Sequence, residues 1–454
     1  MVDELTERVE TAESRPPQPR LVDRAGAWVR QNPSLTAIVV VALALRLGWV
    51  LYVDVSAPTA WQLSGDQFSY YTYGREIAAG HGYESYITGE PTAYYPVGYP
   101  AILASLFFVV GHTPLPDDYV LAANLLHVVL GTASVVLGYL IGRRLLGRLA
   151  GLAVAAILAV FPNLVFQVAT FQLEVTFIFL CLAALAIVVV HDWASGPPST
   201  ARLLAFGAVL GVAVLVRPFA IWFVVALFVA ALAASHGWRR SLRAAAIPLA
   251  VVVGLSIPWT IRNAIRLDAF VVTSTNTGDT LCLDRFDGAT GEFRFADHEG
   301  CADPNLPEVE RNNASTKKAV RWVIDHPGRE VVQIWRRARL MYGSDHDGVE
   351  AVNTLGGGPV MAEGTARRLS RLGDASFAVV GVLAAGGLVV LLGRRNRSRP
   401  EVLLVLLSTA SLVAVPLLLW GNPRFHLPVS PFLAILAGVG VAAAVRFVDA
   451  RRAG

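Results

Sequence analysis

The chain is poor in charge, in lysine and in cysteine. Only 16% of its 454 residues are charged, whereas 54% are hydrophobic. Its lysines are the pair Lys317 and Lys318, and it has three cysteines. So few charges exclude an ordinary soluble protein and indicate a polytopic membrane protein. The cysteine spacing matches no zinc or iron–sulfur site, and without a basic stripe carrying aromatics we expect no nucleic-acid partner.

Several catalytic signatures are also missing. The sequence contains no Walker A motif, no GxSxG and no Rossmann glycine fingerprint, so ATP hydrolysis, serine hydrolysis and nucleotide binding by those routes are not indicated. Residues 1–32 lack a secretory signal and are polar, with Pro16, Pro17 and Pro19. We therefore expect residues 1–34 to form a disordered cytoplasmic tail.

Apolar runs are abundant. They predict an all-α polytopic membrane protein with about ten transmembrane helices. Arg217-Pro218 interrupts the run 202–234, which leaves one bent helix and two short helices both open. Residues 98–111 are predicted to dip into the interface without crossing. The predicted spans are residues 35–53, 119–141, 149–166, 173–190, 202–216, 219–234, 244–260, 375–393, 401–419 and 429–446.

The distribution of arginine predicts the orientation, because basic residues concentrate in short cytoplasmic loops. With both termini inside, the first outer loop carries one basic residue, Arg75. If residues 98–111 crossed the membrane, the basic run 143–148 would move outside and break this pattern. The expected inner arginines outside the two tails are Arg143, Arg144, Arg148, Arg239, Arg240, Arg243, Arg394, Arg395, Arg397 and Arg399.

This topology divides the chain into parts. A transmembrane core (35–261) contains the first outer loop (54–118), and an extracytoplasmic loop domain of mixed structure (262–372) follows it. C-terminal transmembrane helices (373–446) and a cytoplasmic tail (447–454) complete the chain. The loop domain holds Cys282 and Cys301, which an outer compartment would allow to form a disulfide worth ~3 kcal/mol; two free thiols are the alternative.

The first outer loop combines an acid with many tyrosines. Asp66 lies about a dozen residues beyond the first span, which suits a general base that takes a proton from a sugar hydroxyl; a solvated or helix-capping aspartate is the alternative. The surrounding aromatic residues suit a sugar face or a lipid interface. We expect substrate contacts from Tyr70, Tyr71, Tyr94 and Tyr95.

Charged residues at the outer ends of spans are the other candidates. Glu174 begins the fourth span, where an acid is costly and tends to be functional, unless it reaches water. Arg217, Arg262 and Arg424 lie at outer span ends, and a guanidinium suits a phosphate oxyanion; anchoring to lipid headgroups is the alternative. Asp66 and Glu174 lie on the same side, and His426 is a further candidate donor.

Together these motifs resemble the GT-C class of membrane glycosyltransferases, in the branch of protein O-mannosyltransferases and lipid A aminoarabinose transferases. The resemblance covers roughly residues 35–440. The motifs that carry it are, in chain order, Gly65-Asp66, Tyr70-Tyr71, YYPVGYPAILA (94–104), RRLLGR (143–148), Glu174, LVRP (215–218), PWTIRN (258–263) and NPRFHLP (422–428).

The resemblance implies a sugar donor carried on polyprenyl phosphate at the outer face of the plasma membrane, and transfer with inversion. Asp66 would be the base and Glu174 would assist it. Arg262 and Arg424, with Arg217, would stabilise the departing phosphate. Gln67 stands where many members carry a second acid, which weighs against a metal site. No cofactor is assigned, and a divalent metal ion stays an open option.

The acceptor implied by the resemblance is a cell-envelope glycolipid or polysaccharide, with secreted protein as another option. The C-terminal region is short and has no added soluble domain of the protein-mannosylating kind. The alternative functions are a transporter or flippase for a lipid-linked sugar and a non-catalytic binder of that lipid. A transporter would show inverted repeats in its two halves, and the long loops at 54–118 and 262–372 are unevenly placed.

Overall fold

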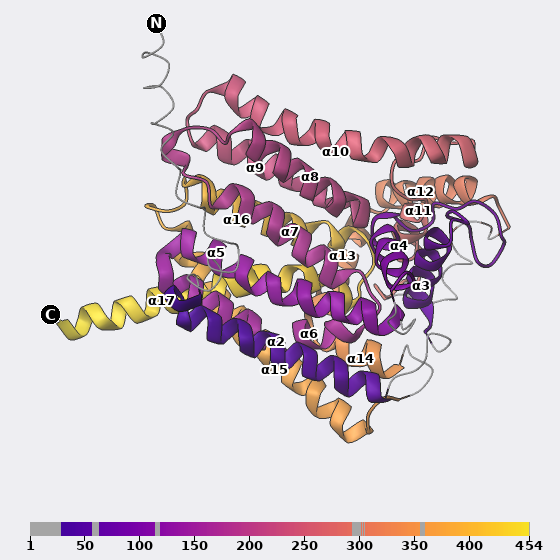
Figure 1. The fold of residues 1–454 in the computed structure, drawn as a ribbon. Helices are drawn as coiled ribbons and strands as arrows, with labels where there is room; N and C mark the ends of the chain where they lie inside the picture. Colours follow the sequence, from indigo (N-terminus) through magenta and orange to yellow (C-terminus); the bar gives the residue numbers. More distant parts are fainter. Residues whose placement is uncertain are drawn as a thin grey trace, which may run out of the picture.

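The computed structural model describes residues 29–56, 63–113, 119–292, 301, 303, 305–354 and 359–453. Most of the predicted tail 1–34 therefore lies outside the described residues. Long helices run alongside one another in a bundle, and shorter helices gather at one end (Figure 1). The bundle helices are α2 (Pro33–Ser56), α5 (Tyr119–Val160), α7 (Glu174–Val189), α8 (Thr200–Val216), α9 (Trp222–Ala233), α10 (Trp238–Arg266), α15 (Glu363–Leu392), α16 (Pro400–Ala414) and α17 (Ser430–Ala453).

The shorter elements fill the connections between these helices. They are α3 (Gly65–Ala78), α4 (Gly98–Val110), α6 (Pro162–Phe166), η2 (Gln167–Ala169), η3 (Trp193–Ser195), η4 (Pro218–Ile221), α11 (Thr277–Cys282), α12 (Glu308–Asp325), α13 (Pro327–Tyr342), α14 (Asp347–Thr354), η6 (Pro416–Leu418) and η7 (Pro423–Val429). The described part of the 262–372 region is helical, where the sequence predicted a mixed domain.

The prediction of an all-α polytopic membrane protein is confirmed. Within the described ranges, six helical segments are long and apolar enough to cross a membrane: α2, α5, α10, α15, α16 continued through η6 (Pro400–Leu418), and η7 continued through α17 (Pro423–Arg452). Four apolar helices are shorter: Gly98–Val110, Glu174–Val189, Thr200–Val216 and Pro218–Ala233. These helices do not confirm the predicted number of ten spans.

Helix α7 lies at the centre of the bundle. It packs against α5, α8 and α16, and thirteen of its sixteen residues are buried. Its sequence EVTFIFLCLAALAIVV has no polar stripe, which is the pattern of a helix surrounded on all sides by others. Glu174 is the first residue of this helix, so its carboxylate is held at the end of the most enclosed element.

The RRLLGR motif marks a break inside α5. Leu146 and Gly147 leave the helical conformation, and Gly147 adopts φ +81°, which favours glycine. Carbonyl groups freed by this break accept hydrogen bonds from other helices: Arg399 donates to Leu145 O at 3.1 Å, and Arg446 donates to Leu146 O at 2.7 Å. The two halves of α5 pack side by side, with Gly138 against Leu158 and Gly142 against Val154, so the motif lies where the chain reverses, as the predicted spans 119–141 and 149–166 require.

The apolar run 202–234 forms two helices. Arg217 has extended backbone angles between α8 and η4, and Pro218 begins the next turn. At this break the chain meets the start of α4, where Gly98 lies against the Leu215 backbone; a Cβ at Gly98 would be 2.5 Å from the Leu215 carbonyl carbon. The close approach fixes α4 beside the Arg217 break.

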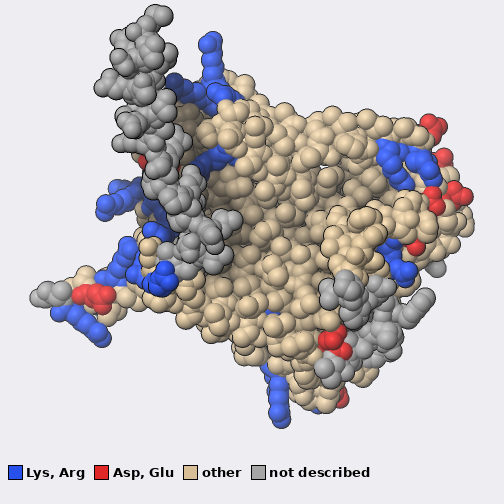
Figure 2. Space-filling view, viewed as in Figure 1, with Lys and Arg blue, Asp and Glu red and all other residues tan. Residues whose placement is uncertain are grey.

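The two ends of the bundle differ. The described chain begins with α2, and α17 finishes, at the same end, while α3, α4, α11 and α12 lie at the opposite end (Figure 1). Basic residues gather at the end where α17 finishes, and they are arginines, because both lysines lie on α12; a tan band with few charges separates this end from the other (Figure 2). We call the end that carries α3, α4, α11 and α12 the site end.

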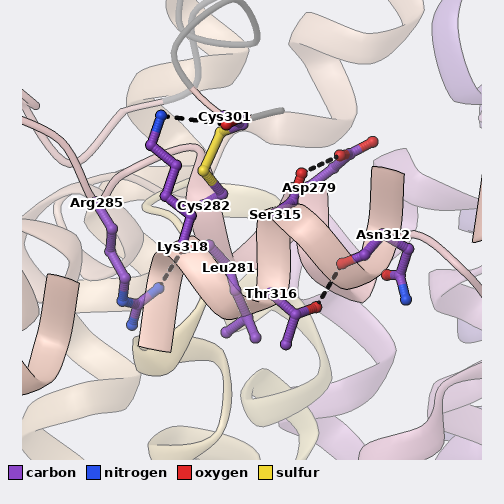
Figure 3. The surroundings of a disulfide bond; sticks show 9 residues. All are labelled: Asp279, Leu281, Cys282, Arg285, Cys301, Asn312, Ser315, Thr316 and Lys318. Carbon is purple, nitrogen blue, oxygen red and sulfur yellow. Dashed lines mark hydrogen bonds between the residues drawn. A yellow bond between two sulfur atoms is a disulfide. The ribbon is translucent and has the colours of Figure 1, made fainter. Parts of the chain in front are cut away.

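At the site end a disulfide joins Cys282 to Cys301 (Figure 3). Cys282 closes α11, and α11 packs against α12. Lys318 Nζ on α12 donates to the Cys301 carbonyl at 3.1 Å, and Asp279 and Ser315 pair across the two helices at 3.3 Å. The disulfide thus fastens the chain at Cys301 to the α11–α12 pair.

We expect replacement of both Cys282 and Cys301 with serine to destabilise this part of the site end by about 3 kcal/mol, because the crosslink restricts the unfolded chain. The measurement is the rate of limited proteolysis in detergent, with and without reductant, which should rise in the variant and in reduced wild type alike. Cys181→Ala, in α7, is the control and should keep the wild-type response. Identical cleavage rates before and after reduction would contradict the prediction.

Candidate functional site

Four charged side chains from distant parts of the sequence meet at the site end. Arg424 is central: its Nη1 lies 2.6 Å from Asp66 Oδ2 and its Nε lies 2.5 Å from Glu174 Oε1. Arg217 also donates to Glu174 Oε1. We call these four residues the Asp66 cluster. It brings together both predicted acids and two of the three predicted arginines.

Local structure places each member of the cluster at a helix end. Asp66 is in the first turn of α3 and Glu174 in the first turn of α7, where the helix dipole favours a carboxylate. Arg217 lies in the α8–η4 break. Asn422 precedes η7, and its Oδ1 accepts from the Arg424 backbone N–H at 2.8 Å. This cap explains the NPR part of the NPRFHLP motif, because it sets where Arg424 enters the site.

Two buried polar atoms in the cluster lack partners within the described part of the chain. The Glu174 side chain is fully buried and that of Arg217 is 9% exposed. Glu174 Oε2 and Arg217 Nη1 have no hydrogen-bond partner there. Each unmet buried group costs about 1–3 kcal/mol, and such exceptions call for an explanation. A polar ligand that supplies a donor and an acceptor would satisfy both atoms.

Asp66 is held from two sides. Tyr95 donates its hydroxyl to Oδ1 at 2.6 Å, while Arg424 pairs with Oδ2. Burial acts to raise the pKa of Asp66, but Arg424, the Tyr95 hydroxyl and Arg217 together outweigh it and lower the pKa below its usual value. The carboxylate is therefore ionised at neutral pH and able to accept a proton.

The predicted tyrosines take different places. Tyr70 is buried and packs edge-on against Tyr95 and Tyr99, at ring distances of 5.3 and 5.1 Å. Tyr71 packs against Phe107 and Phe171, so its ring supports α3. Tyr70 thus packs against Tyr95, whose hydroxyl donates to Asp66, whereas the contacts of Tyr71 are with phenylalanine rings.

Arg262 lies outside the Asp66 cluster in its observed contacts. Its guanidinium donates to the carbonyl oxygens of Tyr83 and Thr92 and lies 5.0 Å from the Trp259 ring. These contacts tie the end of α10 to the 83–92 loop. The geometry therefore assigns Arg262 a part in holding the loop, and does not support its predicted contact with a donor phosphate.

His426 is fully buried beside the cluster rather than in it. Its Nε2 lies 2.9 Å from Asp345 Oδ1, which also accepts from Asn163 Nδ2 at 2.6 Å. Asn163 Oδ1 in turn accepts from the Gly348 backbone N–H. His426 therefore links η7 to α6 and to the segment before α14, and supports Arg424 two residues earlier.

Sequence reasoning missed Asp347, at the start of α14. Its Oδ2 accepts from Gln167 Nε2 at 2.7 Å. Burial raises the pKa of Asp347 to about 6; Arg424 opposes this rise and Glu174 adds to it. The charges of the cluster thus act on this carboxyl group. The only signal in the sequence was the run Asp345-His346-Asp347, which has no periodic pattern around it.

Gln67 replaces the second acid expected from the resemblance, and it is used structurally. Its Oε1 accepts from the Phe171 backbone N–H at 2.8 Å, which connects α3 to the turn before α7. Across the described ranges, no group of three or more His, Cys, Asp or Glu side chains is placed to hold a metal ion. Because arginines also occupy the carboxylates of Asp66 and Glu174, the arrangement does not fit a metal site.

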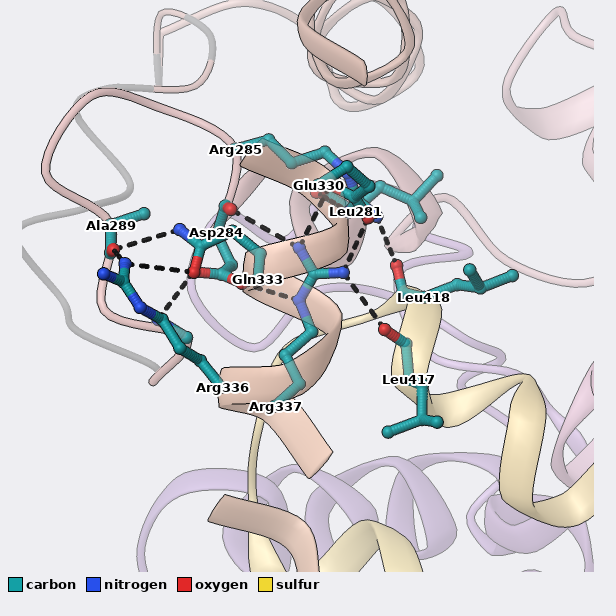
Figure 4. Close-up of polar contacts among 11 residues, drawn as sticks. Leu281, Asp284, Arg285, Ala289, Glu330, Gln333, Arg336, Arg337, Leu417 and Leu418 are labelled. Atoms are coloured by element: carbon teal, nitrogen blue, oxygen red, sulfur yellow. Dashed lines mark hydrogen bonds and ion pairs between the residues drawn. The ribbon is translucent and has the colours of Figure 1, made fainter. Parts of the chain in front are cut away.

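A second, buried charge network supports the segment that leads to Arg424 (Figure 4). Arg337 on α13 pairs with Asp284 at 2.6 Å and Glu330 at 2.8 Å, and all three are buried. The same guanidinium donates to Leu417 O at 3.0 Å, and Arg285 donates to Leu418 O at 2.8 Å. These hydrogen bonds from the loop domain therefore hold the segment between α16 and η7 in place.

A hydrogen bond between backbone groups also holds this segment. The Gly421 N–H donates to Gly291 O at 2.6 Å, and the Gly291 N–H donates to Asp284 Oδ1 at 2.7 Å. The chain that carries Arg424 is thus held at residues 417, 418 and 421, close to the point at which it enters the site.

Comparison with known proteins supports the resemblance on two levels. Residues 101–261 match the model of the family described as dolichyl-phosphate-mannose-protein mannosyltransferase. A comparison with curated protein sequences found no match. The matched segment runs from α4 to α10 and includes Glu174 and Arg217.

Solved structures show the fold. The apo oligosaccharyltransferase of Archaeoglobus fulgidus matches with a TM-score of 0.55 and 13% identity, over 93% of this chain and 51% of that one. The same organism's AglB, in complex with an inhibitory peptide and a dolichol-phosphate, matches with a TM-score of 0.57 and 12% identity, over 94% and 52%. The chain thus spans about half the length of these relatives.

ArnT from Cupriavidus metallidurans bound to undecaprenyl phosphate also matches, with a TM-score of 0.41 and 16% identity, over 92% of this chain and 79% of that one. The family model and the two archaeal structures confirm the predicted resemblance to GT-C membrane glycosyltransferases, and the chain has the fold of the archaeal oligosaccharyltransferase.

We expect Arg337→Met to destabilise the protein by about 3–5 kcal/mol, because the carboxylates of Asp284 and Glu330 would stay buried without their partner. Thermal unfolding in detergent measures the change. Arg321→Met is the matched control: Arg321 pairs with Asp325 on the exposed face of α12 and is 81% exposed, so its loss should change stability by no more than about 0.5 kcal/mol. Equal shifts in both variants would contradict the assignment.

Asp347 predicts a pH dependence of stability. In the folded protein its pKa is about 6, whereas the ordinary value is 3.8. Between these pH values the folded state binds more protons than the unfolded state, so stability should fall as the pH rises through this window. Asp347→Asn should remove that part of the slope in melting temperature, and Asp325→Asn, on the exposed face of α12, should keep it. A wild-type slope in Asp347→Asn would disprove the assignment.

Proposed function

We propose that this protein is an integral membrane glycosyltransferase that moves a sugar from a polyprenyl-phosphate donor to an acceptor hydroxyl at the extracytoplasmic face. The observation that carries the proposal is the Asp66 cluster, in which an ionised carboxylate shares Arg424 with the buried Glu174–Arg217 pair. It combines a proton acceptor with two guanidinium groups at a site that has unmet buried polar atoms.

The proposed reaction is a single displacement with inversion. The acceptor hydroxyl attacks the anomeric carbon and gives its proton to Asp66, forming the new C–O bond. The bond from the anomeric carbon to the phosphate oxygen breaks, and polyprenyl phosphate leaves with the electron pair. Arg424 and Arg217 would stabilise its negative charge. A phosphate leaving group needs little protonation, so no second acid is required.

Glu174 has a positioning role in this proposal. One of its oxygens accepts hydrogen bonds from both guanidinium groups, which fixes their forks beside Asp66 before any ligand arrives. An arriving phosphate would replace part of this contact and would also meet the unpartnered Nη1 of Arg217. Holding charged groups in place before the reaction is an efficient way to stabilise developing charge.

The fold and the charge distribution support the proposed placement. Arginine-rich segments lie at the end of the bundle where α17 finishes (Figure 2), which the positive-inside rule assigns to the cytoplasm. The Asp66 cluster belongs to the opposite end. We propose a multi-pass protein of the plasma membrane with both termini cytoplasmic. The archaeal relative solved with a dolichol-phosphate supports a lipid-phosphate donor.

The donor sugar is proposed as a hexose or a pentose, and the acceptor as an envelope glycolipid, a polysaccharide or a secreted protein. The test is transfer by the purified protein in lipid, given a panel of radiolabelled polyprenyl-phosphate sugars and an envelope extract. Asp66→Asn should lower the rate by at least about 10²-fold while donor binding persists. Glu76→Gln, an exposed acid on the same helix, should keep the wild-type rate.

Full activity in Asp66→Asn would remove Asp66 from the chemistry. Binding of donor without transfer, equal in wild type and Asp66→Asn, would favour the flippase or binding-protein alternatives over the enzyme.

A further inference from the structure

A large cavity opens beside the Asp66 cluster at the site end. Its volume is about 1110 Å³, and its walls come from α3, the 85–95 loop, the segment 266–269 after α10 and residues 305–311 around the start of α12. Pockets of about 300–1,000 Å³ enclose most of a small-molecule ligand, so this cavity has room for more than one sugar ring.

Tyr95 connects the cavity to the cluster. Its side chain lines the cavity, and its hydroxyl donates to Asp66 Oδ1. The other oxygen of Asp66 faces Arg424. Asp66 therefore lies between the cavity and the two arginines. A carboxylate oxygen has more than one acceptor site, so Oδ1 is able to accept from a ligand hydroxyl in addition to Tyr95.

The lining combines aromatic rings, hydroxyl groups and carboxylates. The rings of Tyr73, Tyr86, Tyr94 and Tyr95 line it; Tyr86 is 43% exposed and packs edge-on against Phe68. Aromatic rings suit the apolar C–H face of a sugar, because they offer a large flat surface with little conformational freedom to lose.

Polar groups stand between these rings. The hydroxyls of Ser69 and Tyr86 pair at 3.1 Å at the wall, and the exposed residues Thr88, Glu90 and Glu310 lie at the rim. Carboxylates accept hydrogen bonds from ligand hydroxyl groups, and hydroxyl side chains both donate and accept. A ligand rich in hydroxyl groups matches this set.

Charge argues against an anionic ligand in the cavity. Its two arginines are already engaged: Arg266 pairs with Glu84 at 2.8 Å, and Arg311 pairs with Asp279 at 3.5 Å and lies over the Tyr94 ring. The exposed carboxylates of Glu90, Glu310 and Asp268 would repel a phosphate. The donor phosphate therefore belongs with Arg424 and Arg217, on the other side of Asp66.

The wall is fixed before any ligand binds. Glu308, at the start of α12, accepts from the Ala93 N–H at 2.9 Å and from the hydroxyls of Thr92 and Thr275, both at 2.5 Å. It joins three segments and holds Tyr94 and Tyr95 in place. A rigid wall lowers the entropy cost of binding.

We propose that this cavity binds the acceptor and that the acceptor is a neutral carbohydrate chain, whose terminal hydroxyl passes Tyr95 to reach Asp66. The inference rests on the proposed glycosyltransferase function and names its acceptor class. It assigns recognition to Tyr86, Tyr94 and the rim carboxylates. This proposal excludes a secreted protein as the acceptor.

The first test measures binding without transfer. Ile87 lines the cavity and is 79% exposed, so an environment-sensitive fluorophore attached to Ile87→Cys reports whether the cavity is occupied. The label attaches at this position because Cys181 is buried and the other two cysteines form the disulfide. The probes are trisaccharides of mannose, glucose, galactose and arabinose, a 12-residue Ser/Thr peptide and inorganic phosphate. At least one trisaccharide should give a saturable signal, and the peptide and phosphate should give none.

Tyr86→Ala and Tyr94→Ala, each in the labelled protein, should weaken trisaccharide binding by at least about tenfold, which corresponds to 1.4 kcal/mol. Trp335→Ala is the matched control, because Trp335 is an aromatic residue on α13 that is 65% exposed and does not line the cavity. It should bind as wild type does. Saturation by the peptide or phosphate alone, or the absence of a signal from every one of the trisaccharides, would overturn the proposal.

The transfer assay separates this inference from the proposed function. Tyr94→Ala should raise the KM for the acceptor at least about tenfold, with the KM for the donor unchanged. Trisaccharide binding without transfer in any assay would refute the proposed enzyme and leave a carbohydrate-binding cavity. Transfer that proceeds with an unchanged acceptor KM in Tyr86→Ala and Tyr94→Ala would refute the cavity and leave the enzyme.

Discussion

One carboxylate oxygen, Glu174 Oε1, holds the two arginines of the site together. It is buried at the start of the most enclosed helix and accepts hydrogen bonds from Arg217 and Arg424. In this low-dielectric position the two like-charged guanidinium groups would repel each other without it. The positions of the α8–η4 break and of η7 therefore both depend on this residue, and through Arg424 so does the orientation of Asp66.

The fold surrounds that interaction with supports of two kinds. Within the bundle, the close backbone packing of Gly98 fixes the position of the Arg217 break relative to α4. From the loop domain, Arg285 and Arg337 hold the carbonyl groups that precede η7. These supports matter because the arginines and Glu174 are buried, and a buried charge that loses its partner is costly.

Much of the site could be predicted from the sequence, for a physical reason. Glu174, Arg217 and Arg424 stand at the ends of apolar runs, where a charge is costly and therefore informative, whereas Asp66 was singled out by the aromatic residues around it. The helix break at Arg217-Pro218 follows from the proline. Arg262 shows the limit of this reasoning: its partners are carbonyl oxygens of a loop, which no pattern of side chains reveals. Asp347 was missed because it gains its position only from Gln167 and the folded loop region.

Glu308 has a consequence for how such a protein diversifies. It ties together short connecting segments, whereas Glu174, which holds both arginines of the Asp66 cluster, begins a helix of the bundle. Substitutions among residues 85–95, 266–269 and 305–311 alter the walls of the cavity without repacking a long helix. Under the two proposals, these connecting segments would change independently of the contacts that Glu174 makes with the arginines, so descendants of a common ancestor would exchange one partner molecule for another while conserving the reaction itself.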